Sequence, residues 1–339
     1  MIACYIYLIK WHHQFPASPL PRNHRNCGTG KLPLSNIRVA KQPNTFYMIA
    51  HDPKTWFTPP FHFHRSDTLR RLFPWIIAVF CYSGAIAWLE IEYWKLSEDS
   101  HVRNISMMHT LLGFVISFLL VFRTNTAYER WWEGRKLWGS LVNNSRNLAM
   151  KMAAYLPENS RHRVFFRKII PLYAKSLKNH LRSEATRLEL FDDISETMRQ
   201  KIDLEKHVPN QIASFMFRHV QEMYKEGQID GYQLLALNNE LQSFTDICGA
   251  CERIKNTPIP YSYSIFIKKF ILIYVATLPF GFVFSLGYYV IPIVGFIFYV
   301  LASLELIAEE VEEPFGADEN DLPLGRMVQS IESHIHELI

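Results

Sequence analysis

Two kinds of short motif in this sequence place redox-active or metal-ligating side chains close together. Cys248-Gly-Ala-Cys251 has the C-x-x-C spacing of redox dithiols and of half a zinc site. His62-Phe-His64 and His334-Ile-His336 could each supply two metal ligands. Zinc needs a third and a fourth ligand, and no second cysteine pair accompanies the first. We therefore expect neither motif to bind zinc or carry redox chemistry, and we expect the histidines at the surface.

The signatures of common enzyme classes are absent. The sequence has no G-x-S-x-G, no Walker A motif and no G-x-G-x-x-G, so acyl transfer, nucleotide hydrolysis and dinucleotide binding have no support. Subtracting 32 acidic from 36 basic residues leaves a net charge of +4, which is not typical of nucleic-acid binding. Five irregularly spaced cysteines do not suggest a disulfide framework. We expect no enzyme and no nucleic-acid partner.

Three aromatic residues suggest a different kind of chemistry. Phe114, Phe118 and Phe122 recur every four residues, so a helix would stack them on one face over about 12 Å. One interpretation is ordinary packing. The other is a narrow pore, in which several copies of the helix form an apolar neck that conducts or closes as it wets or dewets. Ring edges carry partial positive charge, so a weakly hydrated anion could pass without a fixed cation.

Segments without charged residues indicate the elements that position this stripe. Residues 72–89 and 104–122 carry no Asp, Glu, Lys or Arg, and residues 270–304 are a further such window of 35 residues. Because about 20 helical residues cross a bilayer, the last window must fold back, and Pro279, Gly281 and Gly287 are the expected break. We predict spans over about 72–94, 105–124, 265–284 and 288–308. The alternative is a set of buried helices in a large soluble core.

Charge outside these spans predicts their orientation. Lys and Arg flank the spans on the side of the chain's middle and termini, whereas the short loop 95–103 is nearly neutral, so both termini are expected in the cytoplasm. The cytoplasmic part is then helical and comprises residues 125–260 and 309–339. Residues 1–47 are rich in proline and are expected to be a disordered or non-native extension before a domain at 48–339.

Two of the predicted cytoplasmic segments have opposite charge. No proline occurs between Pro74 and Pro157, so the second span can continue as one long helix to about Met150. Residues 123–168 carry ten Lys or Arg and three Glu, whereas 305–321 carry eight Asp or Glu and no Lys or Arg. We expect these two segments to pair or to line one vestibule.

Three longer stretches resemble one family. Phe122–Gly139 resembles the signature of bacterial members of the bestrophin family of ion channels, and Gly249–Pro260 and Ala308–Pro323 are similar to two further elements of that family. The resemblance runs in order from about Met48 to the C-terminus. It implies an all-α membrane protein, a homopentamer with four spans per subunit, a neck lined by Phe114, Phe118 and Phe122, and a helical cytoplasmic vestibule.

The resemblance also bears on cofactors. Asp318 and Asp321 fall on positions that bind calcium in animal bestrophins, but Asn320 interrupts the acidic run here. We expect charge pairing as the main role of this segment and only weak calcium binding, with no cofactor required. A second, cytoplasmic constriction is implied somewhere in residues 228–240.

The sequence thus predicts a passive channel for chloride or similar anions, in a bacterial inner membrane. One alternative is a cation channel of the same fold, which the acidic segment 305–321 favours. Another is a membrane-anchored scaffold whose aromatic stripe only packs.

Overall fold

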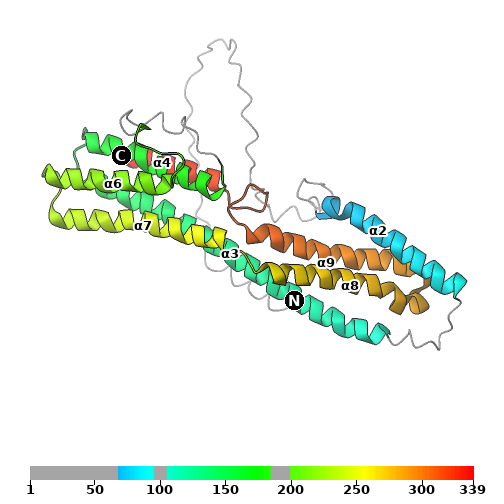
Figure 1. Ribbon diagram of the computed structural model, residues 1–339. Coiled ribbons are helices and arrows are strands. Elements are labelled where there is room, and N and C mark those ends of the chain that lie inside the picture. The colour runs from blue at the N-terminus through cyan, green and yellow to red at the C-terminus, as the bar shows by residue number, and fades with distance from the viewer. Residues whose placement is uncertain (1–67, 95–104, 185–198) are drawn as a thin grey trace, which may run out of the picture. The chain divides into compact units, whose positions relative to one another are not determined.

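The computed structural model describes residues 68–94, 105–184 and 199–339. The regular elements within these ranges are all helical, which confirms the all-α fold. The α-helices are α2 (Thr68–Trp88), α3 (Ile105–Tyr155), α4 (Arg161–Leu181), α6 (Val208–Lys225), α7 (Gly231–Asn256), α8 (Tyr261–Leu286), α9 (Val290–Glu312) and α10 (Leu324–Leu338) (Figure 1). The extension expected over residues 1–47 and the pair His62-Phe-His64 lie outside the described residues.

α3 connects two groups of helices. It continues without a break for 51 residues, about 75 Å at ~1.5 Å per residue. The absence of proline permits this length, and the helix ends at Tyr155, shortly before Pro157. α3 packs on α8 and α9 and also on α7 and α10, and Figure 1 shows that the first pair lies beside its N-terminal half and α7 beside its C-terminal half.

The first group is a bundle of α2, α8, α9 and the N-terminal half of α3. Ile116 and Leu120 of α3, Ile267 of α8 and Val294 of α9 belong to its buried core. Gly295 of α9 permits a close approach to α2, because a Cβ atom there would lie 1.9 Å from Cε1 of Phe80. Small residues at helix crossings are typical of membrane bundles, where close backbone packing drives association.

The apolar surface of this bundle faces outward. Thr68–Tyr93, Met107–Tyr155 and Tyr261–Glu312 are long and apolar enough to cross a membrane, and the most apolar windows of the three are only 22%, 22% and 28% buried. Helices in a soluble core bury such surface, so the bundle is membrane-spanning. The spans expected at 72–94, 105–124, 265–284 and 288–308 correspond in order to α2 with the π-helical turn Leu89–Tyr93, to α3, to α8, and to α9 with the two residues before it.

A turn of three residues separates α8 from α9. Gly287 has φ +54°, a conformation that favours glycine, and it begins the 3₁₀ turn Gly287–Tyr289. Pro279 and Gly281, which were expected to share in the break, lie inside α8. Membrane helices tolerate proline because neighbouring groups satisfy the freed backbone. Of the three expected break residues, only Gly287 lies in the turn at which the 35-residue window folds back.

The second group lies outside the spans and comprises α4, α6, α7, α10 and residues 125–155 of α3. We call it the extramembrane module. Trp138, Phe166 and Phe244 are fully buried in its core. Cys248 and Cys251 of α7 are also buried there, and burial raises the pKa of Cys248 to about 12. Because thiolates carry the redox and metal chemistry of cysteine, these two residues are packing groups.

Candidate functional site

The aromatic stripe lies on the outer side of α3. The side chains of Phe114, Phe118 and Phe122 are 69%, 54% and 51% exposed. Ile116 and Leu120, which lie between them in sequence, are buried against the membrane bundle. The helix therefore directs one face to its own subunit, and the ring-bearing face stays largely exposed in the part of the subunit that the structure describes.

The three rings contact one another along the helix. The centroids of Phe114 and Phe118 lie 6.2 Å apart with the rings almost parallel, at 14°. Those of Phe118 and Phe122 lie 4.7 Å apart with the rings nearly perpendicular, at 87°. Each ring thus limits the rotamers of the next, and the stripe forms a continuous apolar strip. Phe118 and Phe122 meet edge to face, so the positive edge of one ring points at the negative face of the other.

Polar residues continue the same face beyond the stripe. Glu129 and Lys136 are exposed and follow Phe122 after about two and four helical turns, so they stay in line with the rings. The strip thus changes from apolar to charged where α3 enters the extramembrane module.

Behind the last ring, α3 is fixed by a buried ion-pair group. Arg123 Nη2 donates to Glu312 Oε2 at 2.7 Å, and its Nε lies 3.5 Å from Glu305 Oε2. Only 1% of the Arg123 side chain is exposed. Because both carboxylates belong to α9, the group holds α3 to α9 at the residue that follows Phe122.

Arg130 extends this connection to α7. Its guanidinium donates to the carbonyl oxygens of Thr257 and Ile254, each at 2.6 Å, and to that of Glu312 at 3.2 Å. These acceptors are backbone groups at the C-terminal ends of α7 and α9, where carbonyls lack helical partners. One side chain therefore joins three helix segments.

The three stretches that carry the family resemblance meet here. Arg130 links Phe122–Gly139 to Gly249–Pro260 and to Ala308–Pro323. Trp131 Nε1 donates to the Asn320 carbonyl at 3.0 Å. A Cβ atom on Gly134 would lie only 3.1 Å from the ring of Phe315, so glycine permits close packing at this point. Sequence reasoning found these stretches as motifs but missed Arg123 and Arg130 as the residues that join them.

The acidic segment pairs with more than one helix. Glu305 and Glu312 pair with Arg123 of α3, as expected for the oppositely charged segments. Glu309 pairs instead with Lys268 of α8 at 2.9 Å. The side chain of Glu310 pairs with Arg71 of α2 and accepts from Asn320 Nδ2 at 2.7 Å.

Asp318 and Asp321 lie in different environments. Asp321 is buried, and its Oδ2 accepts the backbone N–H of Asp318 at 2.6 Å. Asp318 is exposed. Burial raises the pKa of Asp321 to about 7, so a proton competes with any cation near neutral pH. Among the described residues these carboxylates are not part of a three-residue group of metal-ligand geometry.

The segment implied to hold a second constriction begins α7. Asp230 caps this helix, accepting from Gln233 N at 2.7 Å. Tyr232 and Leu235 are 87% and 63% exposed, whereas Leu237 is fully buried. The first two turns of α7 thus present two large apolar side chains that are exposed in the described part of the subunit.

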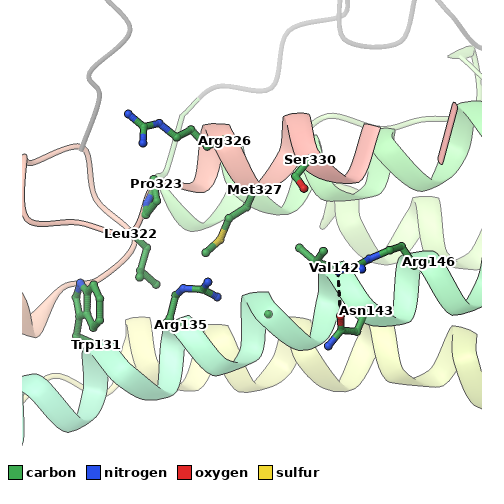
Figure 2. A pocket seen from close by; sticks show the side chains of 11 residues that line it. Trp131, Arg135, Val142, Asn143, Arg146, Leu322, Pro323, Arg326, Met327 and Ser330 are labelled. Carbon is green, nitrogen blue, oxygen red and sulfur yellow. Dashed lines mark hydrogen bonds between the residues drawn. The ribbon is translucent and has the colours of Figure 1, made fainter. Parts of the chain in front are cut away.

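A groove of about 600 Å³ lies between α3 and α10 in the extramembrane module (Figure 2). Arg135 and Arg146 of α3 and Arg326 of α10 line it, together with the apolar Met327. Arg146 Nη2 donates to Asn143 Oδ1 at 3.2 Å. Three guanidinium groups give the groove positive potential, which attracts anions.

The comparisons with known proteins agree with this architecture. Residues 48–337 match the family described as bacterial/fungal bestrophin protein. A voltage-dependent anion channel-forming protein of Nostoc sp. is 39% identical over 230 residues, which are 67% of this chain and 75% of the relative. An Escherichia coli K12 protein of the same description is 30% identical over 84% of this chain and 92% of its own length.

A solved structure shares the fold. The crystal structure of a bacterial bestrophin homologue from Klebsiella pneumoniae, solved by Zn-SAD phasing, superposes with a TM-score of 0.72 at 26% identity. The superposition covers 79% of this chain and 98% of the other. A family match across most of the chain and relatives of at least 30% identity agree with the membrane bundle and its long α3. The chain is therefore an integral membrane protein of the bacterial and fungal bestrophin family.

Proposed function

We propose that this protein is a passive channel for chloride and similar inorganic anions, with a neck lined by Phe114, Phe118 and Phe122. The observation that carries the proposal is the ring-bearing face of α3, which is exposed and unpartnered among residues 68–94, 105–184 and 199–339. The relatives from Nostoc and Escherichia coli are named as anion channel-forming proteins. Those names describe channels rather than enzymes.

The neck requires several subunits. One helix face cannot enclose a pore, and closed cyclic symmetry is the simplest arrangement that brings copies of α3 around an axis. The family resemblance supplies the number five. In a homopentamer, three rings from each subunit would form three apolar layers, which oppose wetting until the neck widens.

Three features favour anions. Ring edges turned to the axis offer partial positive charge. Arg123 pairs with the carboxylates of Glu305 and Glu312. Lys268 pairs with that of Glu309. These ion pairs reduce the electrostatic attraction of the carboxylates for permeating cations. The three guanidiniums of the groove add positive potential beside α3.

A cation channel of the same fold is the second candidate. Glu129 supports it, because this exposed carboxylate continues the face of the stripe. A ring of carboxylates at the end of the neck would attract cations. Lys136, two turns further on, opposes this effect.

We assign the second constriction to Tyr232 by the same reasoning. It is the most exposed large apolar side chain in the implied segment, and a rigid helix cap holds its position. Both termini are proposed to lie in the cytoplasm and the spans in a bacterial inner membrane. We propose no required cofactor, with weak calcium binding at Asp318 and Asp321.

Reconstitution under a salt gradient tests the function. Purified protein in a planar bilayer with asymmetric sodium chloride should show a reversal potential close to the chloride equilibrium potential. A reversal near the sodium potential would replace the anion assignment by the cation one, and Glu129→Gln should then move it towards chloride. Absence of current from protein that is folded and oligomeric would overturn the channel proposal.

A further inference from the structure

A cluster outside the pore elements brings two imidazoles and a carboxylate together. His180 lies in the last turn of α4, His207 is the residue that caps α6, and Glu252 lies near the C-terminal end of α7. One ligand atom from each lies within 4.8 Å of the other two. It is the one such group among residues 68–94, 105–184 and 199–339.

The geometry centres on a single oxygen. Glu252 Oε1 lies 2.6 Å from Nε2 of His180 and 2.5 Å from Nε2 of His207. The two imidazole rings lie 4.4 Å apart, centroid to centroid. All three side chains are about 30% exposed, at 33%, 29% and 28%, so an ion from solvent can reach them.

The surrounding contacts hold the three residues in place. Lys255 Nζ donates to the carbonyl oxygen of His180 at 2.9 Å, which fixes the end of α4 to α7. The backbone N–H of Asn210 donates to Nδ1 of His207 at 3.1 Å, which orients that ring. The helices α4, α6 and α7 also pack on one another. Little rearrangement is needed to gather the ligands.

We propose that His180, His207 and Glu252 bind a zinc ion, one per subunit. Two imidazole nitrogens and one carboxylate oxygen form a ligand set that zinc uses in proteins, with water at the fourth position. Calcium and magnesium prefer oxygen ligands, so the two nitrogens select against them. In the metal-free protein, Nε2–H groups donate to Glu252. When zinc binds at Nε2, each imidazole stays neutral and carries its proton on Nδ1 instead.

Zinc binding has a cost at His207. In the metal-free protein, Nδ1 of His207 accepts the N–H of Asn210. Coordination through Nε2 moves the ring proton to Nδ1, so this nitrogen can no longer accept, and two N–H groups then face each other. Metal-ligating histidines normally donate their second N–H to an acceptor, and loss of such support weakens binding by roughly 10–100-fold. The site is therefore weaker than a structural zinc site and suits reversible binding. Zinc bound there joins α4 and α6 to α7, shortly before α8 begins.

Calorimetry with zinc alone tests the proposal. Full-length protein in detergent, freed of metal with a chelator, should bind one Zn²⁺ per subunit and unfold at a higher temperature with zinc than without. Replacing His180 by Gln, or Glu252 by Gln, should lower the zinc affinity at least tenfold and abolish the zinc-dependent rise. His207→Asn is the sharpest variant, because Asn is a good helix cap and removes only the imidazole.

His336→Gln is the matched control, since it removes an exposed histidine of α10 that lies outside the cluster. It should bind zinc as the parent protein does. The proposal is overturned if the parent protein binds no zinc, or if His207→Asn folds and binds zinc with unchanged affinity. Loss of binding in His336→Gln would also overturn it, because the histidines of α10 would then hold the ion.

Discussion

Arg123 and Glu312 form an ion pair that is almost completely removed from solvent, with 2.7 Å between Nη2 and Oε2. The pair joins α3 to α9 one residue after the last ring of the stripe. Buried side chains thus fix this part of α3, whereas the ring of Phe122 is exposed on an adjacent face of the same helix. The stripe is therefore held by contacts that do not touch the proposed pore.

Breaking this pair should be strongly destabilising. In Arg123→Gln the carboxylates of Glu305 and Glu312 lose their cation while they remain buried. The free energy of unfolding should therefore fall by roughly 3–5 kcal/mol. Thermal unfolding of the detergent-purified oligomer measures this. The control is Lys268→Gln, because the pair of Lys268 with Glu309 is about half exposed. Loss of that pair should lower the free energy of unfolding by less than about 1 kcal/mol. Equal losses in both variants would contradict the assignment.

Removing the rings should widen the neck. Replacing Phe114, Phe118 and Phe122 together by Ala is expected to raise single-channel conductance, because large apolar rings oppose wetting. Phe296→Ala is the control, since that ring is 65% exposed on α9 and outside the stripe. Single-channel current that stays unchanged in the triple variant would show that the stripe only packs.

Gly295 should not tolerate a larger side chain. Gly295→Val places atoms where the ring of Phe80 lies and should push α2 away from α9. The free energy of unfolding should fall by about 1–3 kcal/mol. Adding Phe80→Ala should restore part of the loss, as measured by unfolding temperature. Gly249→Ala serves as the comparison, because a Cβ there would have nothing within 4 Å. Absence of rescue would argue against direct contact as the cause.

Stability should fall as the pH rises towards neutrality. Burial raises the pKa of Asp321 from 3.8 to about 7, so between these values the folded state binds a proton that the unfolded state releases. The contribution of the Asp321 proton to the free energy of unfolding is fully present below about pH 4 and is lost as the pH passes 7. The difference is roughly 2–4 kcal/mol per subunit. Asp321→Asn should flatten the curve of unfolding temperature against pH in this window, whereas Asp318→Asn should not. Parallel curves for Asp321→Asn and the parent protein would refute this.

Calcium binding should be weak for the same reason. The ion must displace both the proton of Asp321 and the N–H of Asp318 from the same carboxylate. Calcium titration at pH 7 followed by calorimetry checks this. Sub-micromolar affinity that disappears in Asp318→Ala and Asp321→Ala would overturn the preference for structural pairing and establish a calcium site.

Local features of the chain were sufficient to predict the helices and their environment. Windows without charge indicated the spans, the lack of proline before Pro157 indicated a long α3, and the four-residue spacing placed Phe114, Phe118 and Phe122 on one face. These features depend on the residue types within one segment and on the geometry of a single helix. Folding does not change them, so they can be recognised before any partner helix is known.

Prediction failed where the result depends on contacts between segments. Pro279 and Gly281 looked like breaks but lie inside α8, because the surrounding bundle accommodates them. The partners of the acidic segment came from α2 and α8 as well as α3, because Arg71 and Lys268 reach it only after the bundle has formed. A list of charges along the chain does not specify which pairs are within reach.

The cluster of His180, His207 and Glu252 shows the same limit most clearly. Its members are 27 and 45 residues apart in sequence and lie on three helices. The local H-x-H and C-x-x-C motifs drew attention instead, yet Cys248 and Cys251 are buried in the core. Spacing along the chain reveals a ligand set only when one segment supplies all of it. Here the packing of α4 and α6 against α7 brings the three ligand atoms together, so only the tertiary structure could place them at one point.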